Sequence, residues 1–84
     1  MKIYKIELDS DLGELWLDDE KQPIAYIHAS DGNFRKEYYG FVFKALKAEL
    51  VELYATDLLS DGEYDALFEC DSKESFYDVL KEKL

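Results

Sequence analysis

The sequence predicts an α+β domain with an antiparallel sheet of about four strands, in the order β-β-β-α-β-α, and two helices covering one face of that sheet. Three observations lead to this prediction: apolar residues alternate in four segments, they recur at helical spacing in two others, and turn residues separate the segments. The 84 residues suit one domain spanning residues 1–84, and 48% of them are hydrophobic. That composition is sufficient for a packed core.

The first thirty residues predict a three-stranded meander. In "KIYKIEL" the apolar residues Tyr4, Ile6 and Leu8 alternate with charged residues, which is typical of a half-buried strand. "ELWLD" and "IAYIHA" predict two further strands, and the short linkers between the three contain Gly13 and Pro23. Strands joined by such short connections pair antiparallel.

The apolar period becomes helical from about Phe34 to Ala55. This helix is predicted by the spacing of Phe43, Leu46, Leu50, Leu53 and Tyr54. Two interpretations of Phe34–Tyr39 stay open, because Gly40 is compatible with both. The segment is either the first turn of the helix, which we favour, or a fourth strand paired through the turn at Asp31 and Gly32.

The segment "EYDALFEC", residues 63–70, predicts the last strand, with Tyr64, Ala66, Phe68 and Cys70 on one side. The other side of such a strand presents a row of carboxylates about 6.6 Å apart, similar to the spacing of phosphates along a nucleic acid. The row consists of Asp61, Glu63, Asp65, Glu69 and Asp71. Aspartate is disfavoured in strands, so this row does not serve the fold.

A final helix is predicted by the apolar stripe Phe76, Tyr77, Leu80 and Leu84. Asp71 or Ser72 is expected to cap it, with Glu74 at capping-box spacing from Asp71.

The net charge of −10, from 20 acids and 10 basic residues, is unevenly distributed. Residues 9–20 and 57–71 each carry −6 without a single Lys or Arg. Crowded like charges oppose folding, so we expect the two segments to converge on one surface that binds a basic protein. The expected partner-binding residues are Asp9, Asp11, Glu14, Asp18, Asp19, Glu20, Asp61, Glu63, Asp65, Glu69 and Asp71.

A metal site and a cofactor are not expected. Asp9, Asp11 and Glu20 match positions 1, 3 and 12 of an EF-hand loop, but Glu14 occupies position 6, where the loop requires glycine. Catalysis is not expected either, because His28 is the only histidine and the sequence contains neither a nucleophile motif nor a glycine-rich phosphate loop.

The remaining features concern location and surface. The opening residues lack the apolar run of a signal peptide, and no stretch reaches the roughly 18–20 apolar residues of a membrane span, so a cytoplasmic protein without membrane contact is expected. The lone Cys70 fits a reducing compartment. The negative charge disfavours direct contact with nucleic acid. The aromatic residues Tyr38, Tyr39, Phe41 and Phe43 form either an exposed patch or part of the core.

Two resemblances accompany these patterns. The stretch "EYYGFVFKALKAEL", residues 37–50, is similar to a segment of the barstar family of ribonuclease inhibitors. That family inhibits through aspartates on the following helix, and the matching positions here are Lys44 and Ala48. In size and charge the chain resembles the small acidic proteins with which phages and mobile elements imitate DNA, including anti-restriction and anti-CRISPR proteins.

The expected function is therefore inhibition of a basic, nucleic-acid-handling protein by imitation of DNA or RNA charge. One alternative is an immunity protein that neutralises a nuclease toxin. The other is an accessory domain whose charge serves solubility only.

Overall fold

A four-stranded sheet with the strand order β3-β2-β1-β4 lies at the centre of the computed structural model. The strands β1 (Lys2–Asp9), β2 (Gly13–Leu17) and β3 (Pro23–Ile27) form an antiparallel meander, and β4 (Glu49–Tyr54) pairs with β1 in parallel. The structure describes residues 1–84, except for the side chain of Glu74. The helical elements are α1 (Gly32–Gly40), a π-helical segment (Phe41–Ala45), α2 (Ala55–Leu58), α3 (Asp61–Glu69), a 3₁₀ segment (Lys73–Phe76) and α4 (Tyr77–Lys81).

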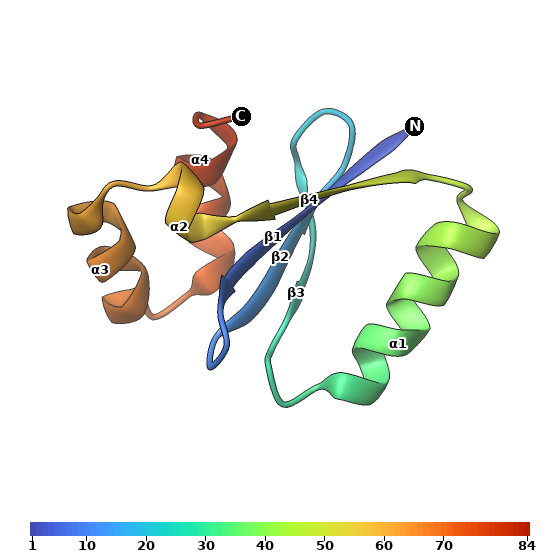
Figure 1. Cartoon of the computed structure of the whole chain (residues 1–84), viewed down its shortest axis with the longest axis horizontal. Coiled ribbons are helices and arrows are strands. Elements are labelled where there is room, and N and C mark those ends of the chain that lie inside the picture. The colour runs from blue at the N-terminus through green and yellow to red at the C-terminus, as the bar shows by residue number, and fades with distance from the viewer.

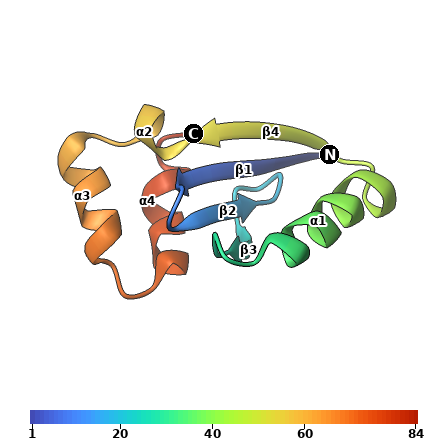
Figure 2. The same cartoon turned by 60° about the horizontal axis from the view of Figure 1, so that its bottom comes forward.

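The α+β class, the four strands and the initial meander are confirmed. The prediction of a purely antiparallel sheet is wrong, because β4 returns to lie parallel to β1 after the crossover through α1. The prediction that helices cover one face is also wrong. Figures 1 and 2 show α1 on one side of the sheet and α2, α3 and α4 on the other.

Both faces of the sheet are apolar, which explains why both carry helices. Under α1 lie Ile3, Trp16 and Ile27, while the opposite core contains Ile6 and Leu15, and all five are 0% exposed. The alternating sequence pattern predicts that only one side of the strands is buried in the core. The residues on the other side of these strands are buried as well, because β1 and β2 are the two inner strands.

The predicted helix over 34–55 is correct in its first half only. Phe34–Tyr39 is helical, as favoured, and the helix ends where Lys47 adopts a positive φ of 51°. Residues 49–54 form β4 instead, which pairs Ile3 with Leu50 and Ile6 with Leu53. The free edge of β1 offers this segment a full set of backbone hydrogen bonds, and that pairing outweighs its helical apolar period.

The predicted strand over residues 63–70 is wrong, since these residues form helix α3 and its C-terminal end. The decisive contact is a capping box at Ser60. Its hydroxyl accepts the Glu63 backbone N–H at 3.3 Å, and the Glu63 carboxylate accepts the Ser60 N–H at 3.0 Å. At helical spacing from Tyr64, Leu67 is 0% exposed and anchors the helix.

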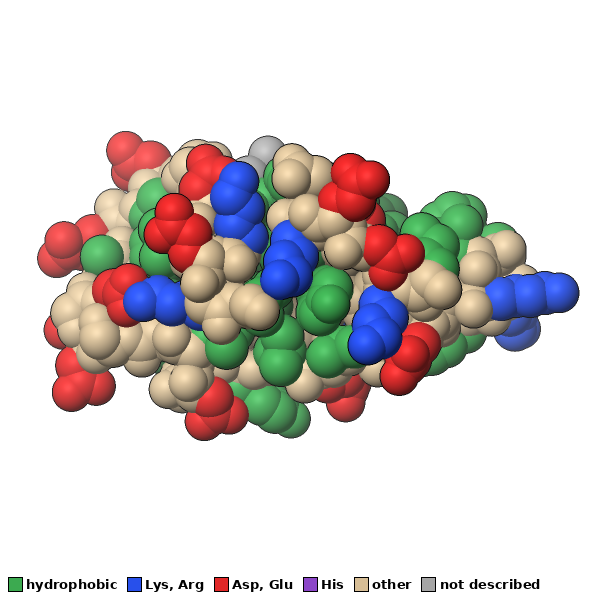
Figure 3. Space-filling model, turned by 90° about the horizontal axis from the view of Figure 1, so that it is seen from above, with side chains coloured by type: hydrophobic (Ala, Val, Ile, Leu, Met, Phe, Trp, Pro, Cys, Tyr) green, Lys and Arg blue, Asp and Glu red, His purple; other side chains and the backbone are tan. Residues whose placement is uncertain are grey.

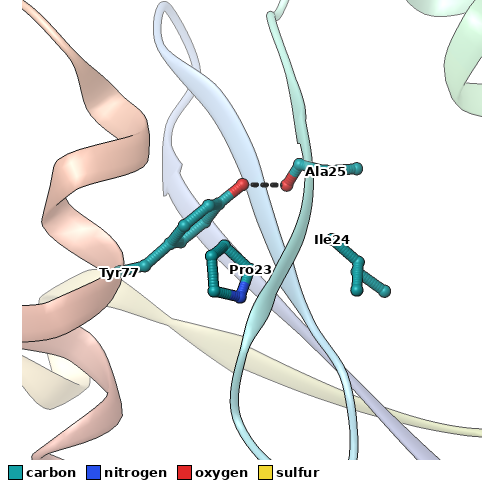
Figure 4. A pocket seen from close by; sticks show the side chains of 4 residues that line it. All are labelled: Pro23, Ile24, Ala25 and Tyr77. Atoms are coloured by element: carbon teal, nitrogen blue, oxygen red, sulfur yellow. Dashed lines mark hydrogen bonds between the residues drawn. The ribbon is translucent and has the colours of Figure 1, made fainter.

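The last helix is confirmed as α4, which follows the 3₁₀ segment and buries Tyr77 and Leu80. The expected capping partner Glu74 lies outside the described side chains. Figure 4 shows the Tyr77 ring reaching from α4 to β3, where its hydroxyl donates a hydrogen bond to the carbonyl of Ala25 beside Pro23 and Ile24. This hydrogen bond connects α4 to β3, the outer strand of the meander.

Candidate interaction surface

The exposed side of α3 carries a row of carboxylates. Asp61, Asp65 and Glu69 are spaced four residues apart, so they lie on one stripe with rises of roughly 6 Å along the axis. All three are exposed, and among the side chains that the structure describes none lies within 4 Å of a cation. Three of the five carboxylates predicted to line a strand therefore form a row on a helix instead.

This stripe does not stabilise the helix. Like charges four residues apart destabilise a helix by about 0.2–0.5 kcal/mol per pair. Asp61 is in the first turn, where the helix dipole favours an acid, but Glu69 is in the last turn, where the dipole opposes one. The negative end of the helix dipole is neutralised by a residue that follows the helix. Lys73 Nζ donates to the carbonyls of Leu67 and Cys70 at 2.6 Å each.

An exposed apolar ring lies beside the acidic stripe. Phe68 is 46% exposed although its ring meets that of Tyr64 edge-on, with the centroids 5.2 Å apart. At helical spacing it falls next to Asp65 and Glu69 on the outer side of α3. The sequence placed Phe68 on the buried face of a strand. The Ser-x-x-Glu pattern at Ser60 would have indicated a helix and an outward position for Phe68.

The turn between β1 and β2 joins this surface through Tyr64. The Tyr64 hydroxyl lies 3.3 Å from the Leu8 carbonyl and 3.2 Å from Asp9 Oδ2, so it can donate to either. Asp9 Oδ1 accepts the backbone N–H of Asp11 at 2.8 Å. Asp9 and Asp11 are thereby held beside α3, as expected from the convergence of the two acidic segments.

The other half of the first acidic segment lies elsewhere. Asp18, Asp19 and Glu20 form the turn between β2 and β3, at the opposite end of β2 from Asp9. Asp18 Oδ1 accepts the N–H groups of Glu20 and Gln22 at 2.9 Å each, which closes the turn. Figure 3 shows lysines among the acidic side chains of this part of the surface, so the negative surface is interrupted there.

Glu14 is the one expected partner-binding residue that lies in the interior. It is 6% exposed and its carboxylate lies 3.3 Å from Lys5 Nζ and 2.9 Å from Arg35 Nε. Lys5 also pairs with Glu52 at 3.1 Å and donates to the Tyr39 hydroxyl at 2.8 Å. Burial alone would lower the pKa of Lys5, but the bonds to Tyr39 and Glu52 outweigh it and raise that pKa.

Glu63 is half-buried, and its carboxylate bonds to other parts of the chain. The Ser60 N–H and the Lys83 ammonium, 3.0 Å away, lower the pKa of Glu63 to about 2. Asp71, in contrast, is exposed directly after α3. It lines a shallow groove of about 570 Å³ together with Leu12, Tyr26, His28, Cys70, Ser72 and Lys73.

The groove contains side chains that are common in catalytic sites, but they bond to other groups. Cys70 Sγ donates to the Ser72 carbonyl at 3.0 Å, and His28 Nδ1 lies 2.8 Å from Ser30 Oγ. None of the hydrogen bonds in the described part of the chain joins the Cys70 thiol to His28 or to Lys73, whose ammonium bonds to the Cys70 carbonyl instead. The described residues also contain no group of three His, Cys, Asp or Glu side chains arranged to hold a metal ion.

Beside the Tyr77 contact, Pro23, Ile24 and Ala25 line a second hollow of about 200 Å³ (Figure 4). This volume is below the roughly 300–1,000 Å³ of typical small-molecule sites. The groove at Asp71 falls within that range, but its Cys70 and His28 side chains bond to serines. The exposed α3 stripe, with the β1–β2 turn beside it, is the candidate interaction surface.

Within the described residues, no helix combines the length and the apolar character that crossing a membrane requires. Comparison with family models, with curated proteins and with solved structures found no match to this chain.

Proposed function

We propose that this chain is a small acidic binding protein that occupies the nucleic-acid site of a basic protein. The binding surface consists of Asp61, Asp65, Phe68 and Glu69 on α3, together with Asp9 and Asp11 in the β1–β2 turn and Asp71 after the helix. Its carboxylates meet lysines and arginines that otherwise contact phosphates. Phe68 provides an apolar contact beside these charges.

The observation that carries the proposal is the alignment of three exposed carboxylates along one side of α3, none of which forms an ion pair with a side chain that the structure describes. Charges that repel one another and stabilise no fold contact are retained most readily where a partner neutralises them. Solubility alone is served equally well by charges of both signs spread over the surface. We therefore place the function in binding rather than in solubility.

The proposal is tested by affinity capture with a matched pair of triple variants. The first changes Asp61→Asn, Asp65→Asn and Glu69→Gln on the stripe. The second changes Asp19→Asn, Glu20→Gln and Glu49→Gln, which removes the same charge from exposed positions away from α3. Wild-type protein is immobilised, exposed to host lysate, and eluted with duplex DNA or with RNA.

We expect the wild type and the second variant to retain basic nucleic-acid-binding proteins that DNA or RNA displaces. The first variant should bind them at least about 10-fold more weakly, about 1.4 kcal/mol. Equal losses in both variants would show that only net charge matters. Binding that neither DNA nor RNA displaces would contradict imitation of nucleic acid.

A further inference from the structure

Exposed basic and aromatic residues lie along α1 and the π-helical segment, together with the exposed acid Glu37, although the chain as a whole is acidic. Phe34, Phe41 and Phe43 are 49–50% exposed. Their rings stack on the two half-buried tyrosines: Phe34 lies 6.1 Å from Tyr38, and Phe43 lies 5.9 Å from Tyr39, between ring centroids. The tyrosines cover Trp16 edge-on, so the phenylalanines form an outer layer that no other part of the described chain covers.

Basic residues outnumber acids along α1 and the segment that follows it. Residues 31–48 contain four basic residues and two acids, against nine acids and three lysines in residues 55–84. Arg35 is committed to Glu14, but Lys36, Lys44 and Lys47 are exposed and form no ion pair with any side chain that the structure describes. We name this surface the α1 patch, and it consists of Phe34, Lys36, Phe41, Phe43, Lys44 and Lys47.

The α1 patch and the α3 stripe lie toward opposite ends of the molecule. Figure 1 shows α1 and α3 at the two ends of the longest axis, along which the chain extends 37 Å. Figure 3 shows acidic side chains at the tip of the α3 end and basic side chains at the tip of the α1 end, with side chains of both signs between them. Charges are screened over about 8 Å at physiological ionic strength, so each end presents its own sign to a neighbour.

We propose that the α1 patch binds the α3 stripe of a second copy of the chain, head to tail. Each surface offers what the other lacks: exposed phenylalanines with lysines at one end, and Phe68 with Asp61, Asp65 and Glu69 at the other. The contact uses two different surfaces, so the assembly is heterologous and extends into short chains or closes into a ring. Single-stranded nucleic acid and anionic membranes also match phenylalanines with lysines, but the net charge of −10 opposes the approach of either.

This inference does not depend on the proposed function, but both use the α3 stripe. A molecule within such an assembly has its acidic surface covered, and a basic partner must displace the neighbour to bind. Self-association therefore competes with partner binding, and it weakens with salt.

Two double variants test the arrangement by sedimentation velocity at low salt. Lys36→Glu with Lys44→Glu inactivates the α1 patch and keeps the stripe, whereas Asp65→Lys with Glu69→Lys inactivates the stripe and keeps the patch. We expect the wild-type mass to rise with concentration, and each variant alone to remain monomeric with self-association at least about 10-fold weaker. An equimolar mixture should form a one-to-one heterodimer, since each variant retains one intact surface.

The following results would contradict the head-to-tail contact. A wild type that stays monomeric at high concentration and low salt overturns the proposal, and so does a mixture that forms no heterodimer from folded variants. A variant that self-associates alone indicates a symmetric contact instead. Patch-dependent binding of the monomeric wild type to an oligonucleotide or to anionic vesicles identifies those ligands as the occupant.

A second measurement uses only the wild type and does not depend on the folding of variants. Amide NMR spectra recorded over a concentration series should show shifts confined to residues of the α1 patch and the α3 stripe. Shifts at only one of the two surfaces would contradict the head-to-tail contact.

Discussion

The carboxylate of Glu63 lies 3.0 Å from the ammonium of Lys83 and also accepts the backbone N–H of Ser60. It thus ties the first turn of α3 to the last residues of the chain. The Ser60 bond is the larger of the two influences, and together they lower the pKa of Glu63 from 4.5 to about 2.

Stability should depend on pH through this group. Because the pKa of Glu63 is lower in the folded state, its contribution is fully present above pH 4.5 and is lost as the pH falls toward 2. Thermal unfolding of the wild type and of Glu63→Gln, followed between neutral pH and pH 2, isolates this effect. The difference between the two proteins should shrink across that interval, and a constant difference would contradict the assignment.

Removing the charge of Glu14 should destabilise the chain. Glu14→Gln leaves Lys5 with Glu52 as its remaining carboxylate and leaves Arg35, whose side chain is 31% exposed, without its carboxylate partner, so the loss should be about 1–3 kcal/mol. Glu52→Gln is the matched control, since it removes the other carboxylate that pairs with Lys5. The Glu52 side chain is 54% exposed. That change should cost about 1 kcal/mol or less. Urea unfolding compares the two, and equal losses would mean that burial of Glu14 is unimportant.

The acids at the two ends of α3 should differ in their effect on stability. Glu69→Gln removes a charge that the helix dipole opposes and that repels Asp65, so the free energy of unfolding should rise by about 0.5–1 kcal/mol. Asp61→Asn loses a favourable dipole contact while relieving the same kind of repulsion, and should stay within about 0.5 kcal/mol of the wild type. Thermal melts check both, and a destabilised Glu69→Gln would assign that carboxylate to the fold.

Gly13 should not tolerate a side chain. Its φ of +108° is unfavourable for other residues, and a Cβ would lie 2.1 Å from the carbonyl oxygen of Ile27, which belongs to the backbone and cannot swing aside. Gly13→Ala should lose more than about 2 kcal/mol. Gly40→Ala is the control, because a Cβ there meets no atom within 4 Å and alanine favours helix by about 0.5–1 kcal/mol. Chemical denaturation should give changes of opposite sign.

The sequence predicts best where local pattern and long-range pairing agree. The meander follows from alternation at Tyr4, Ile6 and Leu8, and its turns need only nearby residues. Residues 49–54 are predicted as helix and form a strand, and residues 63–69 are predicted as strand and form a helix, because contacts outside each segment decide its structure. The strand depends on the free edge of β1, and the helix on the cap at Ser60, which alternation at Tyr64 and Phe68 conceals.

The acidic surface could be predicted in composition but only partly in arrangement. Charge counting identifies Asp61, Asp65 and Glu69, and the contact of Tyr64 with Asp9 joins the two acidic segments. Burial of Glu14 could not be read from the sequence, because it depends on Arg35 of α1 packing over Lys5 on the neighbouring strand β1. The assignment of individual acidic residues to partner binding remains a prediction.

The parallel pairing of β4 with β1 also has a kinetic consequence. Lys2 cannot meet Glu49 until the meander and α1 between them have been arranged, so completing the sheet requires closure of a long loop. Contacts of this kind slow folding, whereas the hairpins of the meander form from neighbouring residues. The meander should therefore collapse first and leave one edge of β1 unpaired. Docking of β4 would then be the rate-limiting step, and substitutions at its Leu50 and Leu53 should slow refolding more than they accelerate unfolding.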